Sequence, residues 1–119
     1  MAPDEPLPDW VPPMLLRPGL PHANAQHQWA LELKWDGMRA QFRVARDGRW
    51  CLRSRPGRNR SDQFPEMAPV ADALHGHDVL LDGELVCLDA GGRPDFHRLR
   101  RRLSASGARA ATLLAAHGP

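Results

Sequence analysis

The stretch MRAQFRVARDGRWCLRSR, residues 38–55, contains the strongest fold signal in the chain. Its first half alternates apolar and polar side chains, which is typical of a β-strand with one buried face. The apolar face carries Ala40, Phe42 and Val44, and the polar face carries Arg39, Gln41 and Arg43. The alternation therefore predicts a strand that packs on a core through one side only.

The second half of the stretch predicts a hairpin. Asp47-Gly48 is a strong signal for a two-residue turn, because both central residues of a type I′ turn need φ > 0. The residues after it, RWCLRSR at 49–55, then form the return strand.

Further elements are predicted on both sides of this hairpin. WALEL, residues 29–33, is apolar enough to predict a strand that ends at Leu33. PEMAPVADALHG predicts a short helix that begins near Pro65 and ends at Gly76. DVLLDGELVCLD, residues 78–89, predicts a long apolar strand, although the Asp82-Gly83 pair inside it is unusual for a plain turn and favours a site there.

The C-terminal residues, 95–118, predict helices. FHRLRRRL places Phe96, Leu99 and Leu103 on one apolar stripe under a basic face, and ARAATLLAAHG is alanine-rich with a glycine stop. Together these patterns predict an α+β fold, an antiparallel β-sheet with flanking helices to one side.

Length and composition indicate one soluble globular domain. The chain has 119 residues, of which 42% are hydrophobic and 25% charged. We expect residues 1–28 to form a proline-rich arm, because they hold seven of the twelve prolines, with VPPMLL anchored on the core. Residues 29–119 then form the domain proper. Cys51 and Cys87 lie in strand-like runs without metal-ligand spacing and are expected to be buried thiols.

The sequence predicts a cytoplasmic protein with a polyanionic partner. The acidic, proline-rich N-terminus is unlike a secretory signal, and no apolar run approaches the ~20 residues that cross a membrane. Five arginines lie within residues 49–60 and five within 93–102. Such clusters are typical of nucleic-acid binding, although an arginine-rich composition without a partner would give the same pattern.

Lys34 is the only lysine in a chain with fifteen arginines. The two side chains differ in one chemical respect that matters here. A lysine amine can lose its proton and act as a nucleophile, whereas a guanidinium cannot. The following Asp36-Gly37 supplies a carboxylate and a tight turn, and Arg39 could direct a bidentate cation at a phosphate. A surface lysine before a β-turn is the alternative for this motif alone.

Four motifs in order resemble the ATP-dependent DNA ligases of bacterial end joining and repair. They are PPMLL, ELKWDGMR, SRPGRNRSDQFPEM and LLDGELVCLDAGGRPDF, and the resemblance covers about residues 12–103. It implies the N-terminal half of the nucleotidyltransferase fold, an ATP-grasp-like fold of DNA ligases and mRNA-capping enzymes. It also implies ATP and Mg²⁺ as cofactors and nicked duplex DNA as the partner, in the cytoplasm at the nucleoid.

The resemblance implies a role for each matching residue. Lys34 would be the catalytic nucleophile that accepts AMP, with Asp36 and Gly37 supporting it. Glu32, Arg39, Arg55 and Glu84 would bind ATP, and Glu84 would also help hold the metal. The arginines expected to contact DNA, by their place in the basic clusters, are Arg58, Arg60, Arg98 and Arg100.

The chain departs from the family after the residues RRRL. The resemblance implies a later adenine-stacking aromatic, a Glu-Gly motif, a Lys-x-Lys motif and an OB-fold domain, and none is found in these 119 residues. The sequence therefore predicts a truncated adenylation domain, inactive alone, that could associate with a complementing ligase half or other repair proteins. An RNA ligase, a capping-type nucleotidyltransferase and a non-catalytic nucleic-acid-binding remnant are the alternatives.

Overall fold

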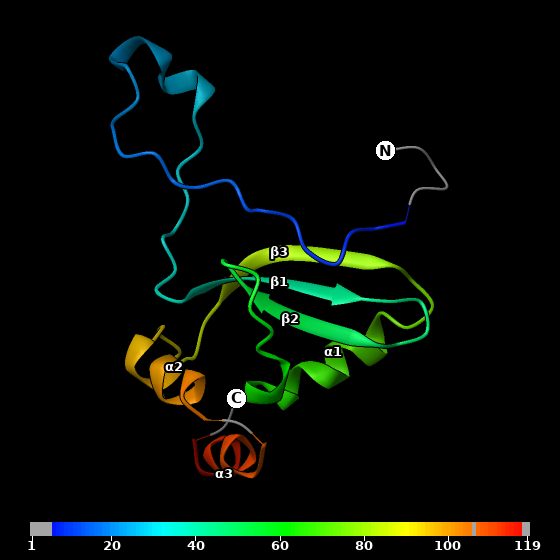
Figure 1. The fold of residues 1–119 in the computed structure, drawn as a ribbon. Helices are drawn as coiled ribbons and strands as arrows, with labels where there is room; N and C mark the ends of the chain where they lie inside the picture. The colour runs from blue at the N-terminus through cyan, green and yellow to red at the C-terminus, as the bar shows by residue number, and fades with distance from the viewer. Residues whose placement is uncertain (1–5, 106, 118–119) are drawn as a thin grey trace.

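The computed structural model describes residues 6–105 and 107–117. At its centre is a three-stranded antiparallel sheet in the order β2-β1-β3 (Figure 1). β1 (Met38–Val44) pairs with β2 (Trp50–Ser54) on one side and with β3 (Val79–Leu85) on the other. α1 lies under one face of this sheet, and the N-terminal arm passes over the other (Figure 1). The predicted α+β class, with helices to one side, is confirmed.

The β1–β2 hairpin is confirmed, but its turn is not the predicted one. The Gly48 amide donates to the Ala45 carbonyl at 2.8 Å, and the Ala45 amide donates to the Arg49 carbonyl at 2.8 Å. Gly48 has φ +87°, whereas no non-glycine residue in the described ranges has a positive φ. Asp47 therefore does not adopt the left-handed conformation that a type I′ turn requires. The loop has three residues, 46–48, and places only its glycine in that region.

The core lies between the sheet and the helices. Ala40, Phe42 and Val44 of β1 are buried, as the alternation predicts, and Leu52 of β2 is buried beside them. Phe64, Ala71, Cys87 and Leu99, from other segments of the chain, also belong to this cluster.

The helical segments are short and closely match the sequence signals. Two 3₁₀ turns, η2 (Ser61–Gln63) and η3 (Pro65–Met67), lead into α1 (Ala68–Ala73), and Gly76 follows with φ +88°. The predicted helix from Pro65 to Gly76 is thus confirmed, with a 3₁₀ first turn. α2 (Phe96–Leu103) and α3 (Gly107–His117) form the C-terminal helices; Gly118, the expected stop, lies outside the described residues.

α2 begins at a side-chain cap and buries one residue that the sequence placed on the solvent face. The Asp95 carboxylate accepts from the amides of His97 at 2.9 Å and Arg98 at 3.2 Å, as an N-cap does. Arg102 is only 5% exposed. Its guanidinium donates to Glu66 at 2.8 Å and lies 5.0 Å from the centre of the Phe64 ring. Arg102 is therefore an internal tie between α2 and η3.

The predicted strand at residues 29–33 is wrong. This segment is irregular up to the start of β1, and the side chains of Leu31 and Leu33 are exposed. The segment pairs with none of the three strands of the sheet, so no neighbouring backbone holds this apolar run as a strand.

The arm also differs from its prediction. Residues 1–5 of the arm lie outside the described range, and the described part contains one 3₁₀ helix, η1 (Ala23–Gln28). VPPMLL is not anchored on the core, because Met14, Leu15 and Leu16 are exposed. Its attachment is polar and lies at Val11, whose backbone pairs with the side chain of Gln41.

Both cysteines are free thiols. Cys87 is buried, and its burial raises the pKa of the thiol above its usual value. Cys51 is only half-buried, and it lies opposite Arg43 on the face of the sheet that points away from the core. Within the described part of the chain, no helix has the length and apolar character needed to cross a membrane.

We expect Leu52→Ala to lower the free energy of unfolding of this chain by about 2–5 kcal/mol, because Leu52 is 2% exposed and its truncation leaves a cavity. Urea unfolding followed by circular dichroism would measure the change. Leu31→Ala is the matched control, since Leu31 is fully exposed. Equal losses from the two substitutions would contradict the position of the core.

Candidate functional site

Gly37 allows the segment before β1 to cross the end of β3. A Cβ at this position would overlap the Leu85 carbonyl oxygen and lie 2.8 Å from Cγ1 of Val86. Only a residue without a side chain fits this close approach. The next residue, Met38, begins β1 and is paired with Leu85. The close approach at Gly37 therefore also sets the direction from which residues 32–36 reach the sheet. The glycine at position 37 therefore has a steric explanation.

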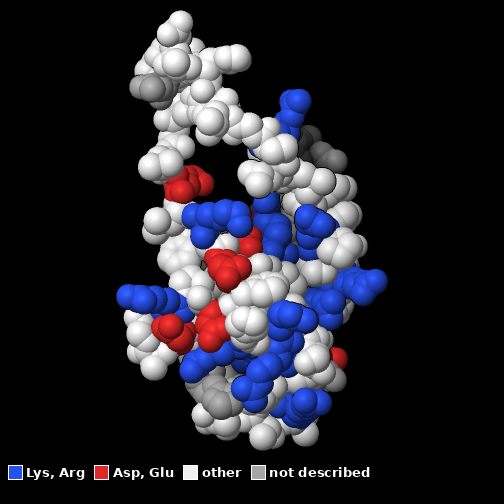
Figure 2. All heavy atoms as spheres, turned by 90° about the vertical axis from the view of Figure 1, so that its left-hand side faces the viewer, with Lys and Arg blue, Asp and Glu red and all other residues white. Residues whose placement is uncertain are grey.

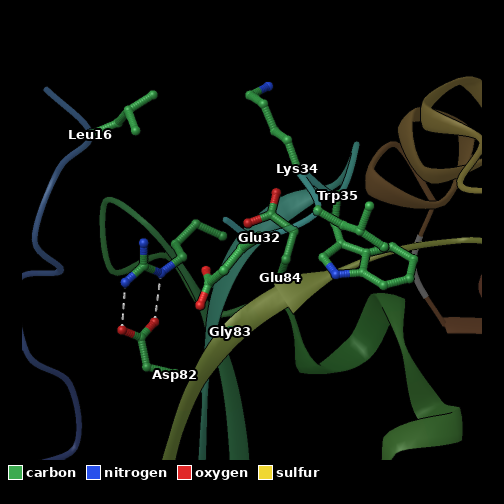
Figure 3. Close-up of a pocket in the computed structure, with 9 residues that line it drawn as sticks. Leu16, Glu32, Lys34, Trp35, Asp82, Gly83 and Glu84 are labelled. Atoms are coloured by element: carbon green, nitrogen blue, oxygen red, sulfur yellow. Dashed lines mark hydrogen bonds and ion pairs between the residues drawn. The ribbon is translucent and has the colours of Figure 1, made fainter. Parts of the chain in front are cut away.

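The crossing creates a hollow of about 570 Å³ on the face of the sheet opposite the helices. Its walls come from the arm, from the irregular segment before β1, and from β1 and β3 (Figure 3). The residues that line it are Leu16, Glu32, Leu33, Lys34, Trp35, Arg39, Asp82, Gly83 and Glu84. Four of the residues expected to act together, Glu32, Lys34, Arg39 and Glu84, are thus brought into one place.

Lys34 is an exposed residue that lines this hollow. Its side chain is exposed and projects away from the strands, on the far side of the hollow from Asp82 (Figure 3). Throughout residues 6–105 and 107–117, no side chain or backbone group forms a hydrogen bond or ion pair with its amine. The amine is therefore accessible to a molecule that enters the hollow.

Arg39 is held by two hydrogen bonds from β3. Its Nε donates to Asp82 Oδ1 at 2.7 Å and its Nη2 to Asp82 Oδ2 at 2.6 Å. These bonds hold the pKa of Asp82 below its usual value and raise the pKa of the Arg39 guanidinium further. Glu84 stands opposite Arg39 in the strand register and adds to the negative potential there. The arrangement fixes the guanidinium and leaves its Nη1 group for a ligand.

The pairing of β1 with β3 explains why these residues meet. Arg39 lies opposite Glu84 and Gln41 opposite Asp82, so all four belong to the polar face of the sheet. Asp82 and Gly83 do not form a turn, because both lie within β3. The role of Asp82 as the partner of Arg39 could not be read from the sequence. The one signal in the sequence was that Asp82 and Glu84 are two residues apart, which places both carboxylates on the same face of a strand. Only the strand register shows that this face is shared with Arg39.

The other expected site residues lie outside the hollow. Asp36 is exposed and does not line it. Arg55 is exposed in the turn after β2, where the Gly57 amide donates to the Ser54 carbonyl at 2.8 Å. Arg55 therefore lies just beyond the end of β2, whose last residue, Ser54, pairs with Ala40 next to Arg39, although Arg55 does not line the hollow.

The four arginines expected to contact DNA fall into two classes. Arg58 and Arg100 are exposed. Arg60 is half-buried and donates to the Gln63 side chain at 3.3 Å, and Arg98 donates to the Leu88 carbonyl at 3.1 Å. Figure 2 shows the face on the left-hand side of Figure 1. Many Lys and Arg side chains lie on this face, most densely in its lower half, where α2 and α3 lie.

Glu84 is the residue expected to help hold a metal ion. The described residues contain no group of three or more His, Cys, Asp or Glu side chains that could hold one. Mg²⁺ is commonly bound by one or two carboxylates together with substrate phosphates. The donor set around Glu84 therefore fits a Mg²⁺ ion shared with a nucleotide and does not fit a metal bound by protein alone.

Comparison with a family model gives a match over most of the chain. Residues 19–115 match the model described as the ATP dependent DNA ligase domain. Similar curated proteins include the multifunctional non-homologous end joining DNA repair protein LigD of Mycobacterium tuberculosis, 40% identical over 94 residues. That match covers 79% of this chain and 12% of the relative. A DNA ligase of Methanosphaerula palustris is 35% identical over 102 residues, covering 80% of this chain and 18% of that protein.

Solved structures give the same result. The ligase domain of M. tuberculosis LigD has a TM-score of 0.54 and 37% identity, over 64% of this chain and 25% of that structure. A mycobacterial DNA ligase D complexed with ATP and MES has a TM-score of 0.55 and 37% identity, over 63% of this chain and 25% of that structure. The chain thus spans about an eighth of the length of the LigD relative and a quarter of these ligase structures.

We expect Gly37→Ala to lower the free energy of unfolding by about 1–3 kcal/mol, because the new methyl group overlaps the Leu85 carbonyl and the backbone must move. Gly83→Ala is the matched control in the same hollow. A Cβ at Gly83 would meet nothing within 4 Å, so a change within about 0.5 kcal/mol is expected. Urea unfolding of both variants would check this, and a neutral Gly37→Ala would contradict the close crossing.

Proposed function

The chain belongs to the family of ATP-dependent DNA ligase domains, and we propose that it supplies the nucleophile and one wall of the nucleotide site of such an enzyme. One observation carries this proposal. Lys34 from the irregular segment, Arg39 from β1 and Glu84 from β3 come from three different segments of the chain, yet they line a single hollow. Lys34 is also exposed, so its amine is accessible.

In the proposed reaction, Nζ of Lys34, as the neutral amine, attacks the α-phosphate of ATP. A nitrogen–phosphorus bond forms, the bond from the α-phosphorus to the bridging oxygen breaks, and pyrophosphate leaves. The AMP group then passes to a 5′-phosphate at a nick, and the 3′-hydroxyl of the neighbouring strand displaces AMP. A guanidinium remains protonated at any working pH, so arginine cannot perform the first step.

The other residues of the hollow orient the nucleotide. Arg39 uses Nε and Nη2 for Asp82, so its Nη1 group remains to donate to a ribose or phosphate oxygen. Glu32 and Glu84 supply carboxylates that can accept from ribose hydroxyls or the adenine amine. Arg55 approaches a phosphate from the turn after β2. Glu84 would hold a Mg²⁺ ion together with phosphate oxygens, and the ion would offset the negative charge of the departing pyrophosphate.

We infer that nicked duplex DNA lies against the arginine-bearing face of Figure 2. Arg58 and Arg100 have exposed head groups that can reach phosphates, whereas Arg60 and Arg98 already make contacts within the protein. The first two are therefore the stronger candidates for DNA contacts. Work on chromosomal DNA would place the protein in the cytoplasm, at the nucleoid.

Lys34→Arg is expected to abolish AMP transfer to the protein and leave folding intact, because Lys34 is exposed and its charge is retained. The test uses a ligase chimaera, in which this chain replaces the segment that it matches in the M. tuberculosis LigD ligase domain. The chimaera is incubated with α-labelled ATP and Mg²⁺ and analysed on a denaturing gel, and circular dichroism monitors folding.

Label on the parent chimaera and its loss in Lys34→Arg would support the proposal. Label retained on the variant would contradict the nucleophile assignment. DNA binding by a parent that takes up no label would favour a non-catalytic nucleic-acid-binding role.

Arg100→Ala is expected to weaken binding of nicked DNA without changing AMP transfer, because Arg100 lies on α2 and does not line the hollow. The loss of one phosphate contact should lower the slope of log affinity against log salt by about 1. Fluorescence anisotropy at several salt concentrations would measure it. Arg46→Ala, an exposed arginine in the loop after β1, is the control. Equal slopes in both variants would contradict the placement of DNA.

A further inference from the structure

The N-terminal arm is attached to the sheet by a buried side-chain amide. Gln41 lies in the middle of β1 and is only 5% exposed. Its Nε2 donates to the Val11 carbonyl at 2.7 Å, and its Oε1 accepts from the Val11 amide at 2.9 Å. The side chain thus offers Val11 the donor and acceptor pair that a neighbouring strand would offer.

This attachment is specific in position. A buried amide that loses its partners carries a desolvation cost, so Gln41 favours a backbone that presents both an N–H and a C=O. An apolar contact would allow the arm to slide, whereas two paired hydrogen bonds fix one residue of the arm over one residue of β1. The arm passes over this face of the sheet (Figure 1).

Trp10, the residue before Val11, lies against the turn that carries Arg55. A Cβ at Gly57 would lie 3.5 Å from Cε2 and 3.6 Å from Cδ2 of the Trp10 ring. Gly57 has φ +84° and closes the turn by donating to the Ser54 carbonyl. The Trp10 Nε1 atom is buried and has no hydrogen-bond partner within the described ranges, so ring packing holds the indole. The indole therefore covers one side of the loop formed by residues 55–57.

We propose that Trp10 and Gln41 are positioning residues for Arg55. Gln41 fixes Val11 on β1, the fixed arm places the Trp10 ring on Gly57, and the ring holds the turn so that Arg55 points at a nucleotide or DNA phosphate. This inference rests on the proposed function, because it concerns an arginine expected to contact phosphate. It assigns the arm a part in the reaction and explains why an otherwise exposed segment is tied to the sheet at one residue.

A purely structural role for the arm would give a different result from a positioning role. If Trp10 acts through Arg55, its removal should cost little once Arg55 has been removed. If Trp10 only stabilises the fold, its removal should cost the same with and without Arg55. A double-mutant cycle separates these cases, because residues that act through one another are not additive.

The cycle is measured in the ligase chimaera as the initial rate of AMP transfer to Lys34 at saturating ATP. Trp10→Ala is expected to lower the rate about 10- to 100-fold, because small displacements of positioning groups have effects of this size. In an Arg55→Ala background the same change should lower it less than about 2-fold. Trp10→Phe keeps a ring on Gly57 and should restore most of the rate. Trp29→Ala, at an exposed tryptophan before β1, is the matched control and should have no effect.

A second measurement tests the attachment of the arm in the 119-residue chain without an activity assay. Gln41→Leu removes both bonds to Val11 and should increase the rate of chymotrypsin cleavage after Trp10 at least several-fold, with cleavage after Trp29 unchanged. Unchanged cleavage after Trp10 would overturn the role of Gln41.

The outcomes for the positioning role and for the proposed function are distinguishable. A parent chimaera without label on Lys34 would overturn the proposed function. A labelled parent in which Trp10→Ala has no effect, or has the same effect in both Arg55 backgrounds, would overturn the positioning role alone.

Discussion

The pairing of β1 on both of its edges is the constraint on which the rest of this structure depends. A strand hydrogen-bonded on two sides has its faces fixed, because a slip of one residue would move every side chain to the opposite face. One face of β1 carries the core residues Ala40, Phe42 and Val44. The other face carries the polar residues Arg39 and Gln41. One face of β1 therefore packs in the core, and the other contributes to the candidate site.

The polar face performs two separate tasks, one at each of these residues. Arg39 is held by Asp82 across the β1–β3 pair and lines the hollow that contains Lys34. Gln41, two residues further along β1, binds the backbone of the arm. Because both side chains belong to one doubly paired strand, the strand sets the spacing between the hollow and the residue that binds the arm.

The differences between the sequence predictions and the structure have a common physical origin. Residues 29–33 are apolar enough for a strand, but they pair with none of the three strands and stay irregular. Arg102 follows a run of basic residues, yet an acidic partner at Glu66 and the Phe64 ring make its burial favourable. Asp47-Gly48 is a common type I′ signal, but the loop uses one left-handed residue, Gly48. In each case the local pattern allowed more than one structure; for Arg102, distant partners selected the buried one.

The sequence by itself determined the β1–β2 hairpin, the helix after Pro65, the helical C-terminal part, the α+β class and the resemblance that singles out Lys34. These depend on local periodicity, turn residues and short motifs, which act over a few residues. Only the tertiary structure decided that Asp82 binds Arg39, that Gly37 lies against Leu85 and that Val11 pairs with Gln41. These contacts join residues 30 or more positions apart, and which of them form depends on strand register and chain crossing. Neither of these is encoded in any short stretch of the chain.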